Sequence, residues 1–245
     1  LMIRRPQRST LDRSSAASDV YKRQVYKLTG AVVNEASIDF DIEGIATINW
    51  SGFASTITSV SKPTKTIYEA INATNNYIRN RLTQLEITAA DTTTFPGAGS
   101  GVYNLTLTGG NITISNNMTF LTPETIGSVN TPLGHVTGAR SVSGNFTCYL
   151  SFETSGGNVG TSTDFFADMK SAAALAKTVN SFQTIFKIGG GTSPFLKFTM
   201  PTAHFEIPAH NIEDVIALET TFQALPSTIG NTDEVTLAYR GVAPA

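Results

Sequence analysis

The residues of this chain that could do chemistry are three histidines, one cysteine and scattered carboxylates, and their spacing matches no established reactive arrangement. His204 and Glu206, in the stretch HFEIPAH, would share one face of a strand and could hold a metal ion. However, Pro208 follows them, and the spacing fits no established ligand motif. Cys148, in NFTCYLSF, has the surroundings of a buried strand thiol. We therefore predict no catalytic residue, no metal site and no cofactor, and we expect that the chain is not an enzyme.

Two further segments could bind phosphate groups. The stretch GAGSG at residues 97–101 is rich in glycine, but it precedes a predicted strand instead of opening a helix, and no Lys-Ser or Lys-Thr follows it. Arg79 and Arg81 lie two residues apart and could hold a DNA backbone. On an otherwise acidic chain, we favour the interpretation that these two cations pair with carboxylates of a neighbouring molecule.

A row of three carboxylates is the most informative charged feature. In ASIDFDIEG, Ile38, Phe40 and Ile42 alternate with Asp39, Asp41 and Glu43, which predicts a strand with one apolar and one acidic face. An ordinary solvated face explains such a row. The alternative is the wall of a channel, because carboxylates repel a passing phosphate backbone whereas Lys and Arg attract it.

The elements that must position these residues are mostly strands. The best-patterned segment is YNLTLTGGNITISNN, residues 103–117, in which apolar and polar residues alternate on both sides of Gly109-Gly110. We predict a hairpin whose two-residue turn is this glycine pair, because primed turns require positive φ angles. Its apolar residues would be Leu105, Leu107, Ile112 and Ile114.

One segment has a helical period. Thr163 is positioned to cap a helix over residues 164–177, and apolar residues recur at spacings of three and four, namely Phe165, Phe166, Met169 and Ala173 among others. This helix must cover another element. A second, short helix over residues 66–74 would turn Ile67, Ala70 and Ile71 inward.

The composition favours one mainly β domain. The chain has 245 residues, of which 40% are hydrophobic and 15% are charged, with a single cysteine. No segment approaches the roughly 20 apolar residues of a membrane span, so we expect no membrane contact. Nine or ten predicted strands and no internal repeat indicate a β-sandwich or barrel with one flanking α-helix, over residues 25–245.

Residues 1–24 do not fit this domain. They contain six of the 17 Lys and Arg residues and two of the 19 Asp and Glu residues, and they lack a hydrophobic period. The stretch SSAASDVYKRQ resembles a translated sequencing adaptor, so we interpret the segment as an artefact or a disordered arm. The natural N-terminus would then be missing. From Val25 onward, 17 acidic residues face 11 basic ones, and the domain is acidic.

The block from Gly101 to Leu150, GVYNLTLTGGNITISNNMTFLTPETIGSVNTPLGHVTGARSVSGNFTCYL, resembles the tail tube (major tail) proteins of tailed bacteriophages. The features that carry the resemblance are the Gly-Gly segment, the FLTPETIG exit, the strand pair up to TCYL, and DFFADM after it. With NYIRNRLTQLEI upstream, the similarity covers most of residues 25–240.

This resemblance implies a structural subunit of the virion, assembled in the cytoplasm of the host bacterium. Copies would form rings of six, and the rings would stack into a conduit that double-stranded DNA crosses without sticking. The resemblance also implies tail partners such as a tape measure and a tail terminator. We expect the acidic row to face the lumen, the segment 105–114 to contact neighbouring subunits, and the helix to shield the sheet or meet a neighbour.

Two other functions remain open at this point. A virion or cell-surface binding module of the adhesin type is a β-sandwich of similar composition, and it would recognise a surface ligand instead of polymerising. A β-rich enzyme is the weakest alternative, because no set of acid, base and nucleophile can be identified.

Overall fold

The computed structural model describes residues 24–61, 78–121, 134–151, 159–178, 180–189, 194–212 and 216–241. Its strands are β1 (Gln24–Thr29), β2 (Val32–Asp41), β3 (Thr47–Phe53), β4 (Thr56–Ser61), β5 (Gln84–Ala89), β6 (Val102–Leu105), β7 (Leu107–Ser115), β8 (Met118–Leu121), β9 (Gly134–Thr137), β10 (Ser141–Tyr149), β11 (Phe182–Ile188), β12 (Phe195–Phe205), β13 (Ala209–Ile212), β14 (Ile216–Leu225) and β15 (Thr236–Arg240). Its helices are α3 (Ser162–Met169) and α4 (Ala172–Leu175), with short 3-10 turns η1 (Asn80–Leu82) and η2 (Gly97–Gly99). The predicted helix over 66–74 and the segment 1–23 lie outside the described residues.

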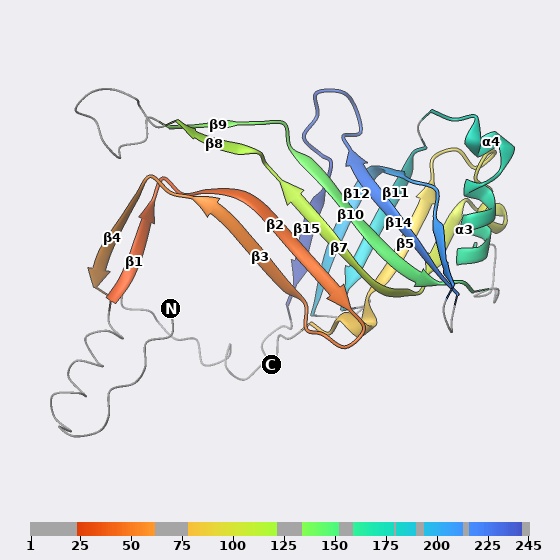
Figure 1. Cartoon of the computed structure of the whole chain (residues 1–245), viewed down its shortest axis with the longest axis horizontal. Helices are drawn as coiled ribbons and strands as arrows, with labels where there is room; N and C mark the ends of the chain where they lie inside the picture. Colours follow the sequence, from red (N-terminus) through yellow and green to blue (C-terminus); the bar gives the residue numbers. More distant parts are fainter. Residues whose placement is uncertain are drawn as a thin grey trace, which may run out of the picture.

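One antiparallel sheet of 11 strands forms the body of the protein (Figure 1). Its strand order is β3-β2-β7-β10-β14-β12-β11-β5-β6, and β13 and β15 pair with β14 and β12. The sheet folds over on itself, because aromatic rings of β2 and β10 contact rings of β11 and β12. Phe40 lies 5.7 Å from Phe186, and Phe146 lies 5.9 Å from Phe205, measured between ring centroids. The core therefore lies between two layers of one continuous sheet, and the predicted mainly β sandwich or barrel is confirmed.

Strand β12 passes from one neighbour to another at a proline. Its residues 195–199 pair with β15, and its residues 202–205 pair with β14, on the same edge. Pro201 lies between these two stretches, where its missing amide hydrogen costs no ladder bond to either neighbour. Despite this proline, β12 is one strand of 11 residues.

The helical segment is shorter than predicted and begins earlier. Thr161, not Thr163, caps α3, and the carboxylate of Asp164 accepts a hydrogen bond from the Thr161 amide in return. The helix stops at Lys170, and the Ser171 hydroxyl caps the single turn α4 by accepting from the Ala174 amide. A serine that bonds the backbone in this way competes with a continuous helix. The predicted helix over 164–177 is thus two helices, and α3 packs against β6 and η2 at one end of the sheet.

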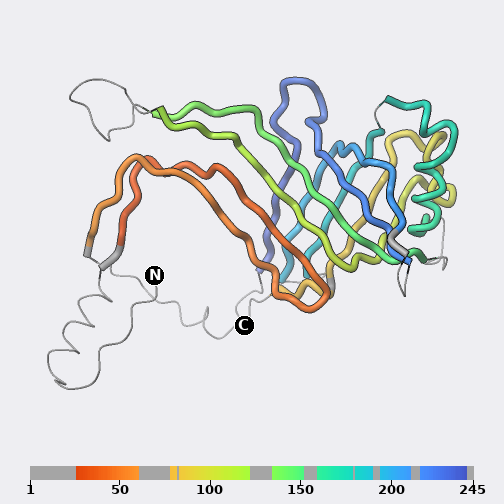
Figure 2. Tube along the Cα trace, in the orientation of Figure 1, coloured from red at the N-terminus to blue at the C-terminus, as the bar shows by residue number. Residues whose placement is uncertain are grey.

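Two ribbons of paired strands continue out of the sheet (Figure 2). Strands β1 and β4 extend the β2–β3 pair, and strands β8 and β9 extend β7 and β10. We call these the first arm and the second arm. The arms meet near their bases, where the rings of Phe53 and Phe120 are 5.7 Å apart and Asn34 accepts a hydrogen bond from the Met118 amide.

Candidate functional site: the polar face of the sheet

The outward side of the first layer is one continuous polar surface. Strands β3, β2, β7, β10 and β14 are in register, so residues of one parity point to the core and residues of the other parity point away from it. The outward set also includes Tyr149, Ala217 and Leu225 near the strand ends. We call its polar members the polar face. Its side chains are Thr47, Asn49, Ser51, Glu35, Ser37, Asp39, Asp41, Asn111, Thr113, Ser115, Ser141, Ser143, Asn145, Thr147, Glu219, Thr221 and Gln223.

The polar face contains carboxylates and uncharged groups, and none of its 17 side chains is Lys or Arg. Asp39, Asn111, Asn145 and Thr221 form one lateral row across β2, β7, β10 and β14. Within that row, Nδ2 of the Asn111 side chain donates a hydrogen bond of 2.6 Å to the Asp39 carboxylate. The carboxylates of this surface therefore repel a phosphate backbone, and its uncharged groups make neutral contacts with it. The surface lacks the cations that hold nucleic acid.

The three residues of the predicted acidic row have different surroundings. Asp39 lies in the middle of the polar face, whereas Asp41 ends β2 and accepts a hydrogen bond from the Gly44 amide in the turn to β3. Glu43 is exposed within that turn. Ile38 and Phe40 are buried as predicted, but Ile42 lies beyond the end of the strand and is 41% exposed. Whether this row faces a lumen stays a prediction.

The predicted turn at Gly109-Gly110 is wrong. Both glycines lie inside β7, between β2 and β10. The chain passes from β6 into β7 at Thr106, and β6 and β7 pair with different strands and not with each other. A Cβ at Gly110 would lie 2.5 Å from the Asn145 carbonyl oxygen of β10 and 2.7 Å from Cζ of Phe40, so the glycine is required by the neighbouring strand and a close aromatic ring and not by a turn.

The flanking apolar residues of this segment contribute to the chain's own core. Leu105 and Ile112 are buried, and Leu107 and Ile114 pack against the same core. A role for the segment in contacts between subunits stays a prediction.

The opposite outward surface, on the second layer, carries cations. Lys187 of β11 lies opposite Lys197 of β12, and Arg240 of β15 pairs beside them, opposite Phe195. Glu86 of β5 lies opposite Ile185 on the same surface. The two layers thus differ in charge on their outer sides, and the basic residues are on the surface away from the polar face.

The residues considered for chemistry have structural partners. His204 lies beside Gln223 at the edge of the polar face, and its Nδ1 accepts a hydrogen bond of 3.2 Å from the Asn180 amide. Across the described ranges, no cluster of three or more His, Cys, Asp or Glu residues could hold a metal ion. Burial raises the pKa of the Cys148 thiol to about 12, so it stays protonated.

The glycine-rich stretch at 97–101 bonds to a carboxylate of the same chain. The amide of Gly97 donates to Oδ2 of Asp168 at 3.0 Å, and the Tyr103 hydroxyl donates to the same oxygen at 2.7 Å. Burial and the adjacent Asp168 carboxylate raise the pKa of Tyr103 well above its ordinary value. This small network joins α3 to β6 and η2, so the stretch has a structural role.

The four residues proposed for the packing helix lie in different environments. Phe165 and Met169 are buried in the core, and Phe165 contacts the rings of Tyr103, Phe182 and Phe205. Phe166 is half-buried and stacks on His210, with 4.0 Å between ring centroids. Ala173 is exposed on α4, because the helix breaks before that residue.

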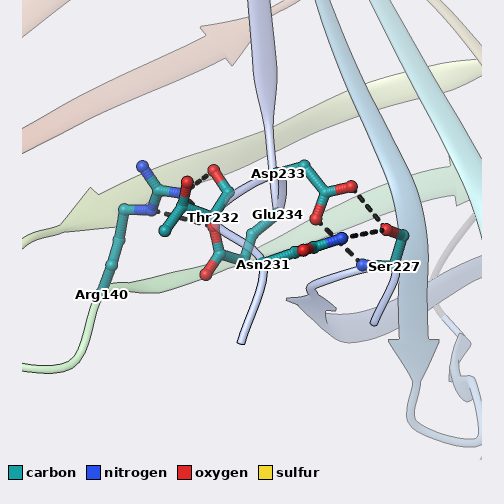
Figure 3. A network of polar contacts seen from close by, with 6 residues as sticks. All are labelled: Arg140, Ser227, Asn231, Thr232, Asp233 and Glu234. Atoms are coloured by element: carbon teal, nitrogen blue, oxygen red, sulfur yellow. Dashed lines mark hydrogen bonds and ion pairs between the residues drawn. The ribbon is translucent and has the colours of Figure 1, made fainter. Parts of the chain in front are cut away.

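Side-chain hydrogen bonds hold the loop between β14 and β15, which the sequence does not predict (Figure 3). We call residues 226–235 the tip loop. The Arg140 side chain donates to the Glu234 carboxylate and to the Thr232 carbonyl, and Nε of Arg140 lies 3.0 Å from Oε2 of Glu234. Asp233 accepts hydrogen bonds from the amide and hydroxyl of Ser227, which hold the pKa of Asp233 below its ordinary value. No single motif marks this loop, because Arg140 and Glu234 are 94 residues apart in the chain.

Among the described residues, no helix is long and apolar enough to cross a membrane. The arms do expose apolar side chains to solvent. On the first arm, Tyr26, Leu28 and Ile57 are all more than half exposed, and on the second arm Val136 is 52% exposed. These residues have the character of a contact surface and not of a solvated loop.

Comparison with known proteins identifies relatives of the chain. The family model described as phage tail tube protein matches residues 6–224. The chain is 30% identical over 219 residues to the tail tube protein pb6 of Escherichia phage T5. This match covers 84% of the chain and 44% of the T5 protein, so the chain spans less than half the length of this curated relative.

Proposed function

The chain belongs to the phage tail tube protein family, and we propose on this basis that its copies form rings that stack into a tube for the passage of double-stranded DNA. This family is structural and not enzymatic, and its members are tail components of the virion. The observation that carries the proposal is the polar face, an uncharged and acidic surface that covers one whole layer of the sheet.

In this proposal the polar face lines the conduit. A duplex moving through a narrow bore must not be held by its backbone, and adhesion to DNA grows with the number of Lys and Arg residues near the phosphates. Asp39 and Glu219 repel the backbone, whereas Asn111, Asn145 and Thr221 offer it neutral groups. The cations Lys187, Lys197 and Arg240 then belong to the outer surface of the tube.

Ring closure would use the open edge of the sheet. The two ends of the strand order are β3 and β6. The edge of β6 is partly covered, because Gly160 exchanges backbone hydrogen bonds with Val102 and Asn104. Strand β3 carries no charged residue and ends the sheet on the other side. A long uncharged edge strand pairs readily with another chain, so β3 is the edge that we assign to the neighbouring copy.

The two arms support self-assembly. A two-stranded ribbon is at best marginally stable alone in water. The first arm also exposes Tyr26 (67%), Leu28 (56%) and Ile57 (64%). Contact with neighbouring copies would bury these side chains and stabilise the ribbon. Rings of six, and binding of a tape measure and a tail terminator, are the finer parts of the proposal, and they rest on the family resemblance.

A thiol-accessibility experiment on the assembled protein tests which face lines the bore. Thr221→Cys places a thiol on the polar face, and the matched variant Gln183→Cys places one on the outward side of β11; both positions are exposed. The native Cys148 is fully buried and gives no background. We expect a maleimide attached to a carrier protein too large for the bore to label both variants as dispersed subunits, but only Gln183→Cys in tubes.

Each outcome bears on a separate part of the proposal. Equal labelling of the two variants in tubes would remove the assignment of the polar face to the bore. If electron microscopy of the purified full chain shows dispersed particles at every concentration, the tube function itself is wrong.

A further inference from the structure

The tip loop presents a completely exposed isoleucine on a rigid support. Ile229 has an exposed fraction of 100%, the highest of the large apolar side chains in the described ranges. It occupies the second position of a turn in which the Asn231 amide donates to the Thr228 carbonyl. Gly230, at the third position, has a φ of +92°, as a type II turn requires. The turn thus holds Ile229 away from the chain's own surface.

Side-chain bonds fix this loop before any partner arrives. Arg140 ties Glu234 and Thr232 to the start of β10, and Asp233 and Asn231 both bond Ser227 across the base of the turn (Figure 3). A loop that is already ordered loses little conformational entropy when it docks, so its contacts translate into affinity more fully than those of a flexible loop.

An apolar hollow lies at the opposite end of the sheet. The tip loop follows the upper end of β14 in Figure 1, whereas the hollow lies at the lower end, between the end of β2, η1 and the start of β7. Its volume is 190 Å³, and its apolar lining includes Phe40, Ile42, Leu107 and Tyr149. Ile42 and Tyr149 are 41% and 42% exposed. A cavity of about 150 Å³ accepts a group as large as benzene, so the hollow is large enough for one isoleucine side chain.

Each of the two ends carries a charged group that can pair with the other end. The tip loop contains the carboxylates of Asp233 and Glu234 and no Lys or Arg. The hollow is lined by one cation, Arg81, and by one carboxylate, Asp41. Asp41 accepts a hydrogen bond from the Gly44 amide, whereas Arg81 is exposed and forms no ion pair within the described part of the chain. Glu234 is already paired with Arg140, so Asp233 brings the remaining negative charge to the docking end. This agrees with the expectation that Arg81 serves a carboxylate of a neighbouring molecule.

We propose that Ile229 of one copy inserts into the hollow beside Phe40, Ile42 and Tyr149 of the next copy along the tube axis, with Asp233 facing Arg81. This inference rests on the proposed tube function and names a contact between successive rings. Ile229 and the hollow lie at opposite ends of one chain. Copies aligned in the same direction therefore bring Ile229 of one copy to the hollow of the next. Such a head-to-tail contact does not close on itself and therefore builds an open stack.

Cysteine cross-linking of full-length protein tests the contact directly. The pair Ile229→Cys with Ile42→Cys should give a ladder of disulfide-linked chains when tubes are mildly oxidised, and the ladder should extend beyond the number of copies in one ring. The control pair Leu175→Cys with Ile42→Cys uses a residue of α4 that is also exposed (59%), and it should stay monomeric. Cys148 is buried and does not contribute.

Several results would overturn the inference. Tubes of the Ile229 and Ile42 pair that give no linked products exclude the contact. Products that stop at the size of one ring place the contact within a ring. Dimers from Ile229→Cys alone indicate that two tip loops meet each other.

A second variant measures the contribution of the contact. Ile229→Ser should leave the fold intact, because the side chain is fully exposed, but it should raise the concentration needed for tube formation by about tenfold or more. Leu175→Ser should leave that threshold unchanged. Tubes of Ile229→Ser at the wild-type threshold contradict this inference and leave the tube function standing, whereas wild-type protein that forms no tubes contradicts the tube function.

Discussion

Phe222 and Gly144 lie directly opposite each other on β14 and β10, and the aromatic ring occupies the space that a side chain at residue 144 would need. A Cβ at Gly144 would lie 2.7 Å from Cζ of Phe222 and even closer to the Asn111 carbonyl of β7. The same arrangement occurs one strand away, where Phe40 of β2 covers Gly110 of β7. Two neighbouring strands thus each carry a glycine that allows a ring to lie flat against the sheet.

Gly144→Ala should destabilise the fold by about 1–3 kcal/mol, because the added methyl group forces the ring or the neighbouring strand to move. Unfolding in urea measures this change. Gly109→Ala is the matched control on β7, because a Cβ there would meet only the Phe40 carbonyl at 3.5 Å, an ordinary contact. Equal stability of the two variants would show that the sheet yields at Gly144 without cost.

Tyr103→Phe should cost about 1.5–3 kcal/mol, the typical value of a hydrogen bond to a charged group. The change removes the donor at 2.7 Å from Asp168 and leaves that carboxylate with only the Gly97 amide among the contacts described above. Chemical denaturation gives the measurement. Tyr239→Phe, at a side chain that is 60% exposed, should have no effect. A neutral Tyr103→Phe would mean that water replaces the hydroxyl.

Cations placed on the polar face should make tubes retain DNA. Asn145→Lys with Thr221→Lys adds two positive charges per copy to one lateral row, and Asn145→Gln with Thr221→Gln is the neutral control. Tubes assembled with short duplex DNA are sedimented at low and high salt. We expect the Lys variant to carry DNA at low salt only, because phosphate contacts weaken steeply with salt concentration. Identical DNA content in both variants would argue that this row does not meet DNA.

Trp50 should report ring closure. It is the single tryptophan of the chain, it lies on the edge strand β3, and 59% of its surface is exposed. If β3 pairs with a neighbouring copy, the indole loses water contacts and its fluorescence emission moves to shorter wavelength as assembly begins. Below its raised threshold for tube formation, Ile229→Ser should still show this shift, because rings and stacking use different surfaces. An unchanged spectrum in assembled protein would assign ring closure to another edge.

The tip loop should loosen in acid. The folded-state pKa of Asp233 is lowered by its hydrogen bonds to Ser227, so the charged carboxylate stabilises the loop above the ordinary pKa of 3.8, and this stabilisation is lost as the pH falls through the lowered value. NMR titration of the Asp233 carboxyl in dispersed full-length protein follows this change. In Ser227→Ala the midpoint should rise toward the ordinary value. The same midpoint in both proteins would exclude the Ser227 bonds as the cause.

Local alternation in the sequence predicts the strands well, but it does not predict their connections. The parity of Ile38, Phe40 and Asp39 on β2 is read correctly, because burial on one side of a strand leaves a period of two. The turn predicted at Gly109-Gly110 is wrong because the sequence does not distinguish a glycine in a turn from a glycine packed under an aromatic ring. The position of Phe40 above Gly110 depends on pairing over 70 residues of separation, which no local pattern contains.

Helix limits and the tip loop show the same restriction. Thr161 and Thr163 both precede the apolar period, so the sequence alone does not distinguish them as caps of α3; the reciprocal bond of Asp164 selects Thr161. The Arg140–Glu234 pair requires β10 and the loop after β14 to be brought together first. The polar face as a whole could have been found by noting that strand residues of one parity lack Lys and Arg. The separation of charge between the two layers needs the strand order.

The alternation along β2, β7, β10 and β14 also has an evolutionary meaning. Neighbouring residues of one strand are under different constraints, because Phe146 packs in the core while Asn145 is exposed on the polar face. A lineage can therefore alter the chemistry of the polar face by substitutions at every second position without redesigning how the polypeptide folds. Residues at these positions should be substituted often, but the substitutions should exchange one short neutral or acidic side chain for another.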